Sequence, residues 1–371
     1  MPSRILLMAR ELNLGGSERQ MTETARFLDR ARFDPRVGCF LPAGLRGEEL
    51  RAAGVPVVHF PIHSYKSASA ISGARQLIRY IRDEKIDLVH TFDYPLNVFA
   101  IPVARWFTNA IAVSSQRFHR EITPKGYLKL LQMSDRVADA VVVNCDFLRR
   151  HMVEEQHVPA RKVHVCHNGI DLSFFRASEK VERAAFTIGA VCALRPEKGL
   201  PVLLDAFGQV RSLVPGMKLA IVGSGPELEG LQAQARKLGI FEDCVFQPAT
   251  SQIPTWLRTL DIFVLPSLSE AFSNALMEAM ACGCCVVASK VGGNPELVQP
   301  EKTGLLFESA TVRDLAAALK RLIENPVLRR DLAAAGQRLI HENYSAECAA
   351  TRMGEIYARL LGSSPTRATY R

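Results

Sequence analysis

The chain has 371 residues, of which 48% are hydrophobic and 23% charged, and its formal net charge is +8. This length exceeds what one ordinary hydrophobic core fills, so we expect two globular domains. The amino-terminal apolar run is too short for a signal peptide, and no stretch of 18 uncharged apolar residues occurs anywhere. The sequence therefore predicts a cytoplasmic protein.

Positive charge is concentrated in the first half. Residues 1–170 contain 24 Lys and Arg against 17 Asp and Glu, whereas residues 171–371 contain 22 against 21. A basic half favours an anionic partner, such as the inner face of the cell membrane or a phosphorylated lipid, although a solvated basic surface explains it equally well. Nucleic acid is not expected as a partner, because aromatic residues make up only 7% and no recognition motif occurs.

The nine cysteines lie mostly inside apolar runs, as reduced core residues do. Cys282, Cys284 and Cys285 form the only cluster, and neither a second cluster nor a suitably spaced histidine pair accompanies them. We therefore expect no metal site.

The first half alternates short apolar runs with amphipathic segments. Strands are expected at residues 4–8, 37–41, 55–60, 86–90, 110–114 and 140–144. Helices are expected from about residue 17 to 30 and at 47–53, 70–85, 96–107 and 126–137. This alternation predicts a parallel, doubly wound sheet, in which ligands meet the carboxyl ends of the strands.

Two connecting segments in this half contain residues that could bind a ligand or take part in catalysis. Gly15 and Gly16 can let the backbone approach a ligand closely, with Ser17 as the cap of the following helix. After the strand at 110–114, basic side chains alternate with apolar ones, and His119 lies among them. This segment is expected either to lie against a membrane or to form a buried amphipathic helix. The residues concerned are Arg117, Arg120, Lys125, Lys129 and Arg136, and Phe118, Ile122, Tyr127, Leu128, Leu130 and Leu131.

The first half ends in His167-Asn168-Gly169-Ile170-Asp171, where Asn-Gly favours a turn with positive φ. Residues 173–183 are polar and suit a linker. A strand is expected at 186–194, and Arg195 and Lys198 follow it. The planar guanidinium of Arg195 and the mobile ammonium group of Lys198 both suit the binding of a diphosphate.

The second half continues with strands and helices in alternation. Strands are expected at 218–222, 244–247 and 305–307, and helices at 254–260, 312–324, 326–341 and 345–361, followed by a loose tail. Gly223 and Gly225 form a tight turn, but Leu228 stands where a dinucleotide fingerprint needs a third glycine. A nicotinamide oxidoreductase is therefore improbable.

The stretch at 261–298 carries most of the chemistry. A buried strand at 261–265 leads to a loop with Glu270, and Ser273 or Asn274 caps a helix that buries Glu278. After a strand at 286–289, Gly292-Gly293 is expected to offer free N–H groups, and Asn294-Pro295 suits the N-cap and first turn of another helix. Two helix amino ends and two glutamates thus converge, and a sugar nucleotide has the phosphates and hydroxyls that they bind.

The segments PSLSEAFSNALMEAMACG and GGNPEL closely resemble the donor-site signature of the retaining glycosyltransferases of family four. The alternative to a donor site is purely structural: Glu270 would cap the helix and Glu278 would pair with a core arginine. The resemblance implies the glycosyltransferase-B fold: two Rossmann-like, doubly wound parallel-sheet domains facing a cleft. The domains would be residues 1–172 and 173–344, with 345–371 crossing back to the first.

The resemblance also implies roles for individual residues. Glu278 would hold the ribose, Glu270 a sugar hydroxyl, and Lys198, with Arg195, the leaving diphosphate. Further donor contacts would come from Gly16, Gly223 and the backbone of Phe272, Ser273 and Asn274, and His119, or Arg117 in its place, would lie near the reacting sugar. Ala193 and Ala271 depart from the family pattern, which has Arg and Gly there.

The expected activity is transfer of a sugar from a UDP- or GDP-linked donor to a glycan or lipid-linked acceptor in polysaccharide assembly. No Asp-x-Asp pair occurs, so no cofactor and no divalent metal are expected. A sugar-nucleotide epimerase or phosphorylase of the same fold, and a non-catalytic nucleotide-binding relative, remain alternatives.

Overall fold

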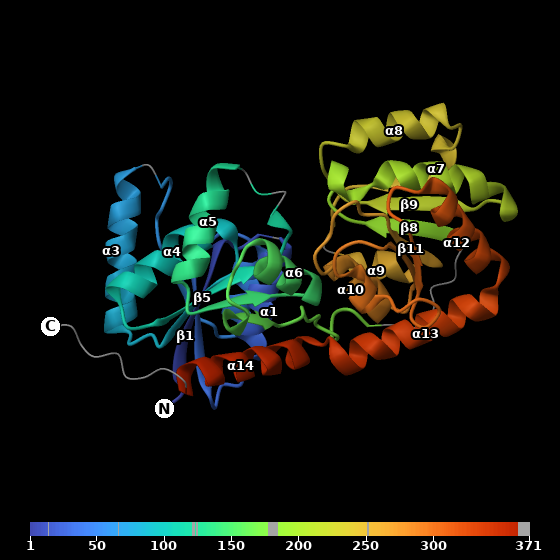
Figure 1. The fold of residues 1–371 in the computed structure, drawn as a ribbon. Helices are drawn as coiled ribbons and strands as arrows, with labels where there is room; N and C mark the ends of the chain where they lie inside the picture. The colour runs from blue at the N-terminus through green and yellow to red at the C-terminus, as the bar shows by residue number, and fades with distance from the viewer. Residues whose placement is uncertain are drawn as a thin grey trace. The chain divides into compact units, whose positions relative to one another are not determined.

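The computed structural model describes residues 1–13, 15–65, 67–120, 123, 125–176, 185–250 and 252–362, with the backbone alone at residue 125. It divides into two compact units, residues 1–169 with the segment from 346 onward, and residues 170–345. Ile122, the Lys125 side chain, most of the expected linker and the tail from 363 lie outside the described residues. Each unit is a parallel sheet covered by helices (Figure 1).

The sheet of the first unit has seven strands in the order β3-β2-β1-β4-β5-β6-β7, all parallel. The strands are β1 (Ser3–Glu11), β2 (Phe33–Leu41), β3 (Val57–His59), β4 (Leu88–Thr91), β5 (Ile111–Gln116), β6 (Ala140–Val143) and β7 (Val163–Val165). The helices are α1 (Gly16–Phe27), α2 (Leu45–Ala52), α3 (Ala68–Asp83), α4 (Tyr94–Phe107), α5 (Lys125–Val137), α6 (Asp146–Arg150), the π-helix η2 (His151–Glu155), η3 (Ala160–Lys162) and α14 (Ala346–Gly362).

Strand β1 shows why this sheet is covered on both faces. Ile5 and Leu7 belong to a core shared with α1 and α14, whereas Leu6 and Met8 belong to the opposite core, shared with α3 and α4. Because alternate residues of a strand point to opposite faces, a continuous apolar run requires helices on both sides.

The sheet of the second unit has six parallel strands in the order β10-β9-β8-β11-β12-β13. The strands are β8 (Thr187–Val191), β9 (Lys218–Val222), β10 (Cys244–Gln247), β11 (Ile262–Leu265), β12 (Cys285–Ser289) and β13 (Leu305–Phe307). The helices include η4 (Pro196–Lys198), α7 (Leu200–Val210), α8 (Leu228–Lys237), α9 (Ile253–Arg258), α10 (Asn274–Ala281), α11 (Asn294–Leu297), α12 (Val312–Glu324) and α13 (Pro326–Asn343). Both sheets thus have the Rossmann order 3-2-1-4-5-6, extended by one strand in the first unit.

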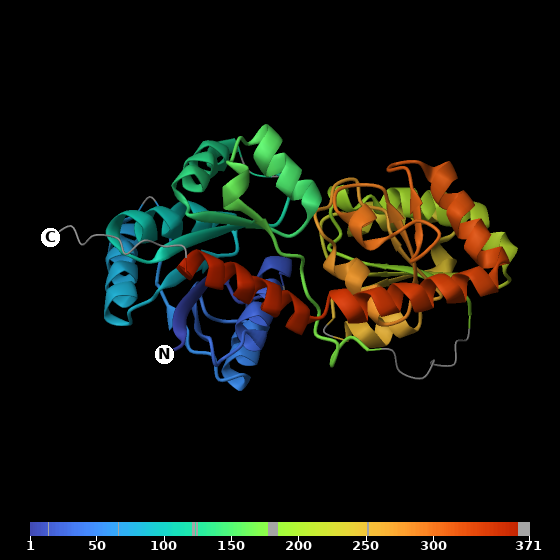
Figure 2. The same ribbon diagram turned by 60° about the horizontal axis from the view of Figure 1, so that its bottom comes forward.

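The last helix, α14, returns the chain to the first unit and packs on α1 (Figure 2). Tyr357 is fully buried there, and its hydroxyl lies 2.6 Å from Nδ1 of His90, whose Nε2 lies 2.8 Å from Ser115 Oγ. Burial, and secondarily the positive charge of Arg117, holds the pKa of His90 well below its ordinary value, so this histidine is neutral.

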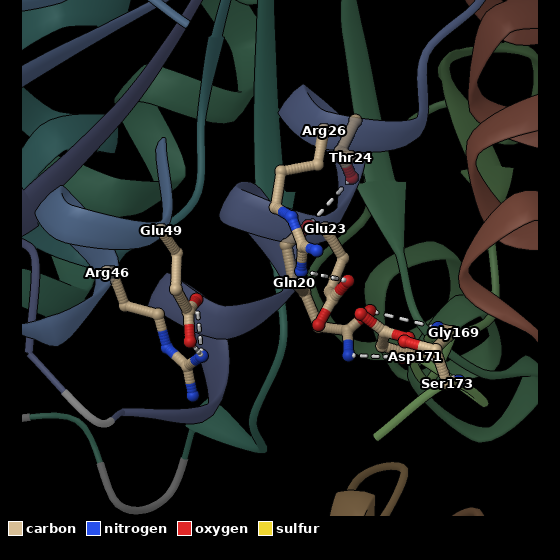
Figure 3. A network of polar contacts seen from close by, with 9 residues as sticks. All are labelled: Gln20, Glu23, Thr24, Arg26, Arg46, Glu49, Gly169, Asp171 and Ser173. Atoms are coloured by element: carbon tan, nitrogen blue, oxygen red, sulfur yellow. Dashed lines mark hydrogen bonds and ion pairs between the residues drawn. The ribbon is translucent and has the colours of Figure 1, made fainter. Parts of the chain in front are cut away.

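At the end of the first unit, Gln20 of α1 holds the backbone of Gly169 (Figure 3). Its side-chain amide donates to the Gly169 carbonyl at 2.8 Å and accepts from the Gly169 N–H at 2.9 Å. Asn168 and Gly169 do not have positive φ and form no turn, so the predicted Asn-Gly turn is wrong. The two bonds from Gln20 satisfy the N–H and the carbonyl of Gly169.

Other expectations about single elements also need correction. Gly15, not Ser17, is the N-cap of α1. Strand β7 and the helical segment formed by α6 and η2 were missed, because the first is only three residues long and the second lacks a clear amphipathic period.

Candidate functional site

The strand order of the second unit reverses between β8 and β11, and ligands of such sheets bind beyond the carboxyl ends of the strands at this point. The segment after β8 contains Arg195 and η4 with Lys198, and the segment after β11 contains Glu270 and leads into α10. The polar residues singled out from the sequence therefore come from two neighbouring strand ends.

Lys198 and Glu270 form the central contact of this edge. Lys198 Nζ donates to Glu270 Oε2 at 2.7 Å, and Ser267 Oγ donates to the same oxygen at 3.2 Å. The two charged side chains are only 21% and 14% exposed. Burial alone would lower the pKa of Lys198, but the charge and the hydrogen bond of Glu270 outweigh it and hold that pKa above its ordinary value. The lysine is therefore a fixed cation.

Backbone contacts fix the two loops against each other. The Leu268 N–H donates to the Glu197 carbonyl at 2.8 Å. Gly199 has φ +61°, and a Cβ there would lie 2.2 Å from the Pro266 carbonyl oxygen. Only glycine permits this approach, which positions the end of η4 directly beside the loop that carries Glu270.

The turn after β12 packs on the same loop. Gly292 has φ +55°, and a Cβ there would lie 1.7 Å from the carbonyl oxygen of Glu270. The Gly293 N–H donates to the Ala271 carbonyl at 2.6 Å, so the expectation that this turn offers free N–H groups is wrong for Gly293. The N-cap of α11 is Gly293 rather than Asn294, whose Nδ2 instead donates to the Ser289 carbonyl at 3.0 Å. The turn supports Glu270.

Helix α10 begins directly after this loop. Ser273 is its N-cap, and the Ser273 Oγ accepts from the Leu276 N–H at 3.2 Å. Glu278 follows one turn later and is 5% exposed, among the buried side chains of Leu276, Met277 and Ala279. Phe272 packs against Tyr344, with ring centroids 5.6 Å apart. The predicted start of this helix and the predicted burial of Glu278 are confirmed.

Two other predicted donor residues of this unit are placed differently. Gly223 follows β9, and a Cβ there would lie 1.8 Å from the Cys192 carbonyl oxygen, so this glycine lets the β9 turn pack on the chain after β8. The Arg195 side chain is 64% exposed, and its Nη1 lies 4.0 Å from Glu197 Oε1. Of the two predicted cations, only Lys198 contacts Glu270.

The predicted residues of the first unit lie on different elements. Gly16 is the exposed first residue of α1. Arg117 directly follows β5, donates to Asn168 Oδ1 at 2.7 Å and lies over the Phe92 ring. His119 lies two residues further on, beside Phe147 of α6 and His151 of η2. The roles proposed for these residues remain predictions.

Sequence reasoning missed a chain of serine contacts that holds the Glu270 loop. Besides donating to Glu270, Ser267 accepts a bond at its carbonyl from Ser289 Oγ at 2.6 Å, and both serines are fully buried. The signal was present in the sequence, because Ser289 ends one predicted buried strand and Ser267 lies two residues after another. Buried hydroxyls need partners, and here they connect β11 with β12.

Comparisons with known proteins give a family match in each half of the chain. The family "Glycosyl transferases group 1" matches residues 173–339, and "Glycosyltransferase Family 4" matches residues 14–174. The two matches meet near the division between the units. The chain therefore belongs to the group 1 glycosyltransferases of family 4.

The similar curated proteins are named as enzymes that transfer sugars. A D-inositol 3-phosphate glycosyltransferase of Segniliparus rotundus is 29% identical over 64% of this chain and 56% of its own length. A GDP-mannose-dependent alpha-(1-6)-phosphatidylinositol monomannoside mannosyltransferase of Mycolicibacterium smegmatis is 34% identical over 45% of this chain and 46% of its own. The chain thus spans about half the length of these relatives.

Solved structures establish the fold class. Anabaena Alr3699/HepE in complex with UDP and glucose superposes with a TM-score of 0.84 at 21% identity, covering 96% of this chain and 100% of that one. A glycosyltransferase from Rickettsia africae gives 0.84 at 18% identity, with coverage of 98% and 100%. Each unit is Rossmann-like, and the fold is glycosyltransferase-B.

None of the described helices has both the length and the apolar character that crossing a membrane requires.

Replacing Gly292 by alanine is expected to displace the Glu270 loop. The substitution forces an L residue to positive φ, at a cost of about 1–2 kcal/mol, and brings a methyl group onto the Glu270 carbonyl. Gly239→Ala is the matched control, because Gly239 has φ +64° with nothing within 4 Å of the added Cβ. Urea unfolding should show a larger loss of stability for Gly292→Ala than for the control. Equal losses would contradict this packing.

Proposed function

We propose that this protein is a retaining glycosyltransferase that moves a sugar from a nucleotide-sugar donor to a hydroxyl of a glycan or lipid-linked acceptor. The observation that carries the proposal is the Lys198–Glu270 contact of 2.7 Å at the point where the strand order of the second sheet reverses. A sugar diphosphate needs a cation at its phosphates and acceptors for its hydroxyls. This contact supplies both from adjacent loops.

The cation acts on the leaving group. When the bond between sugar and diphosphate breaks, negative charge grows on the phosphate oxygens, and a fixed cation in a poorly solvated place stabilises this charge strongly. Lys198 meets this condition because it is charged, four-fifths buried and held by Glu270. The amino end of α10 adds the positive end of a helix dipole in the same region. Arg195, being exposed, is assigned a lesser role.

The two carboxylates act on hydroxyls. Glu270 lies on the loop before α10, where one oxygen is already held by Lys198 and Ser267, and we assign it to a hydroxyl of the sugar. Glu278 lies one turn into α10 and is assigned to the ribose. Backbone groups of Phe272, Ser273 and Asn274 at the start of α10 would face the sugar and diphosphate. The names of the two curated relatives and the UDP complexes of the structural neighbour support a nucleotide-sugar donor.

Retention of configuration requires attack from the face that the diphosphate leaves. The acceptor oxygen forms the new bond to the sugar carbon while the bond to the phosphate oxygen breaks, and the acceptor proton passes to that phosphate. Protein side chains then have to stabilise charge rather than form a covalent intermediate. His119 and Gly16 stay candidates for contacts to the sugar and the phosphates.

The exposed face of α5 supports a location at the inner face of the membrane. Leu130 and Met133 are about half exposed, and the exposed Lys129 and Arg136 flank them. Apolar side chains between basic ones on one helical face suit an anionic lipid surface.

Replacing Lys198 by methionine should lower kcat by roughly 10²–10³-fold, the loss typical of removing one group that stabilises developing charge. The measurement is release of nucleotide with each nucleotide sugar that raises the melting temperature. Lys290→Met is the matched control, because Lys290 is an exposed lysine at the end of β12, paired with Glu308. A Lys198→Met enzyme with undiminished kcat would refute the assignment.

Transfer should continue after treatment with EDTA, because Lys198 and the helix end take the place of a metal at the diphosphate. The rate with the chelator is compared with the rate after Mn²⁺ or Mg²⁺ is restored. Loss of activity that either ion reverses would contradict metal independence.

Binding to vesicles with anionic lipid should weaken about fivefold when Lys129 is replaced by glutamine, since each basic side chain near such a surface contributes about 1 kcal/mol. Met133→Gln should also weaken it. Leu213→Gln, at an exposed apolar residue of the second unit, is the control. Binding that all three variants and added salt leave unchanged would exclude this surface.

A further inference from the structure

Two histidines and a glutamate lie together in the first unit, and the proposed reaction gives them no joint role. His119, in the loop after β5, lies beside His151, with ring centroids 4.1 Å apart. His151 and Glu155 are the first and last residues of the π-helix η2, and Nδ1 of His151 lies 2.9 Å from Glu155 Oε2. One ligand atom from each of the three lies within 4.8 Å of the others.

His151 gives a second, independent sign of a missing ligand. Its side chain is only 4% exposed, and its Nε2 is buried without a hydrogen-bond partner. An orphaned buried nitrogen is costly, whereas its lone pair is what a metal ion uses.

The surrounding structure holds these groups in place. Arg120, next to His119, is buried and forms an ion pair with the buried Asp135, and its Nη1 donates to Gln156 Oε1 at 3.1 Å. Gln156 directly follows η2, and its N–H donates to the His151 carbonyl at 3.1 Å. The loop with His119 is thereby fastened to the element that carries the other two groups.

We propose that His119 and the Nε2 atom of His151 bind a borderline divalent cation of the Zn²⁺ type, with Glu155 orienting the His151 ring through Nδ1. Imidazole nitrogens are common ligands of Zn²⁺, whereas hard ions such as Mg²⁺ prefer oxygen ligands. Glu155 is exposed and His119 half-buried, so the ion can enter from solvent. These residues belong to the first unit, whereas Lys198 and Glu270 belong to the second, and the proposal does not depend on the roles assigned to that pair.

The test is titration of the untagged, metal-free full chain with Co²⁺, followed by its visible absorption, and then displacement by Zn²⁺. One equivalent should bind, and His151→Ala, His119→Ala and Glu155→Gln should each weaken binding at least about tenfold. Glu154→Gln is the matched control, since Glu154 is the exposed neighbour of Glu155. His63→Ala controls for binding by an exposed histidine.

Melting curves without metal separate loss of the site from loss of the fold. His119→Ala, at a half-buried loop residue, should melt like the parent without metal and lose only the rise in melting temperature that Zn²⁺ gives the parent. Equal binding by the parent and the His119→Ala and Glu155→Gln variants, or equal weakening by Glu154→Gln and Glu155→Gln, would overturn the proposal. Failure here leaves the assignment of Lys198 and Glu270 untouched, because neither residue takes part.

Discussion

The ion pair between Lys198 and Glu270 is the interaction on which the account of this protein depends. It joins the ends of β8 and β11, the two strands between which the order of the second sheet reverses. Two opposite charges that are mostly buried need each other, since either one alone would be costly in that place. The same need makes the pair a suitable receptor, because a diphosphate offers the lysine further negative charge and a sugar offers the glutamate donors.

The loops around this pair are held by backbone more than by side chains. Gly199 lies against the carbonyl of Pro266, Gly292 against that of Glu270, and Gly223 against that of Cys192. At each point a side chain would collide with main chain, so the positions of the charged groups depend on residues that have no chemistry of their own. Ser267 and Ser289 add hydrogen bonds between the two central strand ends. The precision of the site therefore comes from its scaffold.

Much of this was predictable from the sequence because it depends on local patterns. The strands at 218–222 and 244–247 and the helix at 312–324 have the predicted bounds, and the cap at Ser273 follows from its place before good helix formers. Contacts between distant segments were not predictable. No local sequence pattern predicts that Gln20 holds Gly169, where the expected turn does not form. None predicts that the Gly293 N–H donates to the Ala271 carbonyl. The short strand β7 and the π-helix η2 likewise depend on tertiary contacts.

The central claim is tested most directly by a crystal structure of the protein with a nucleotide sugar that raises its melting temperature. The account predicts a phosphate oxygen within ion-pair distance of Lys198 Nζ, a sugar hydroxyl at Glu270 and the ribose at Glu278. A ligand bound elsewhere, with Lys198 and Glu270 still paired only with each other and Glu278 facing protein alone, would contradict it.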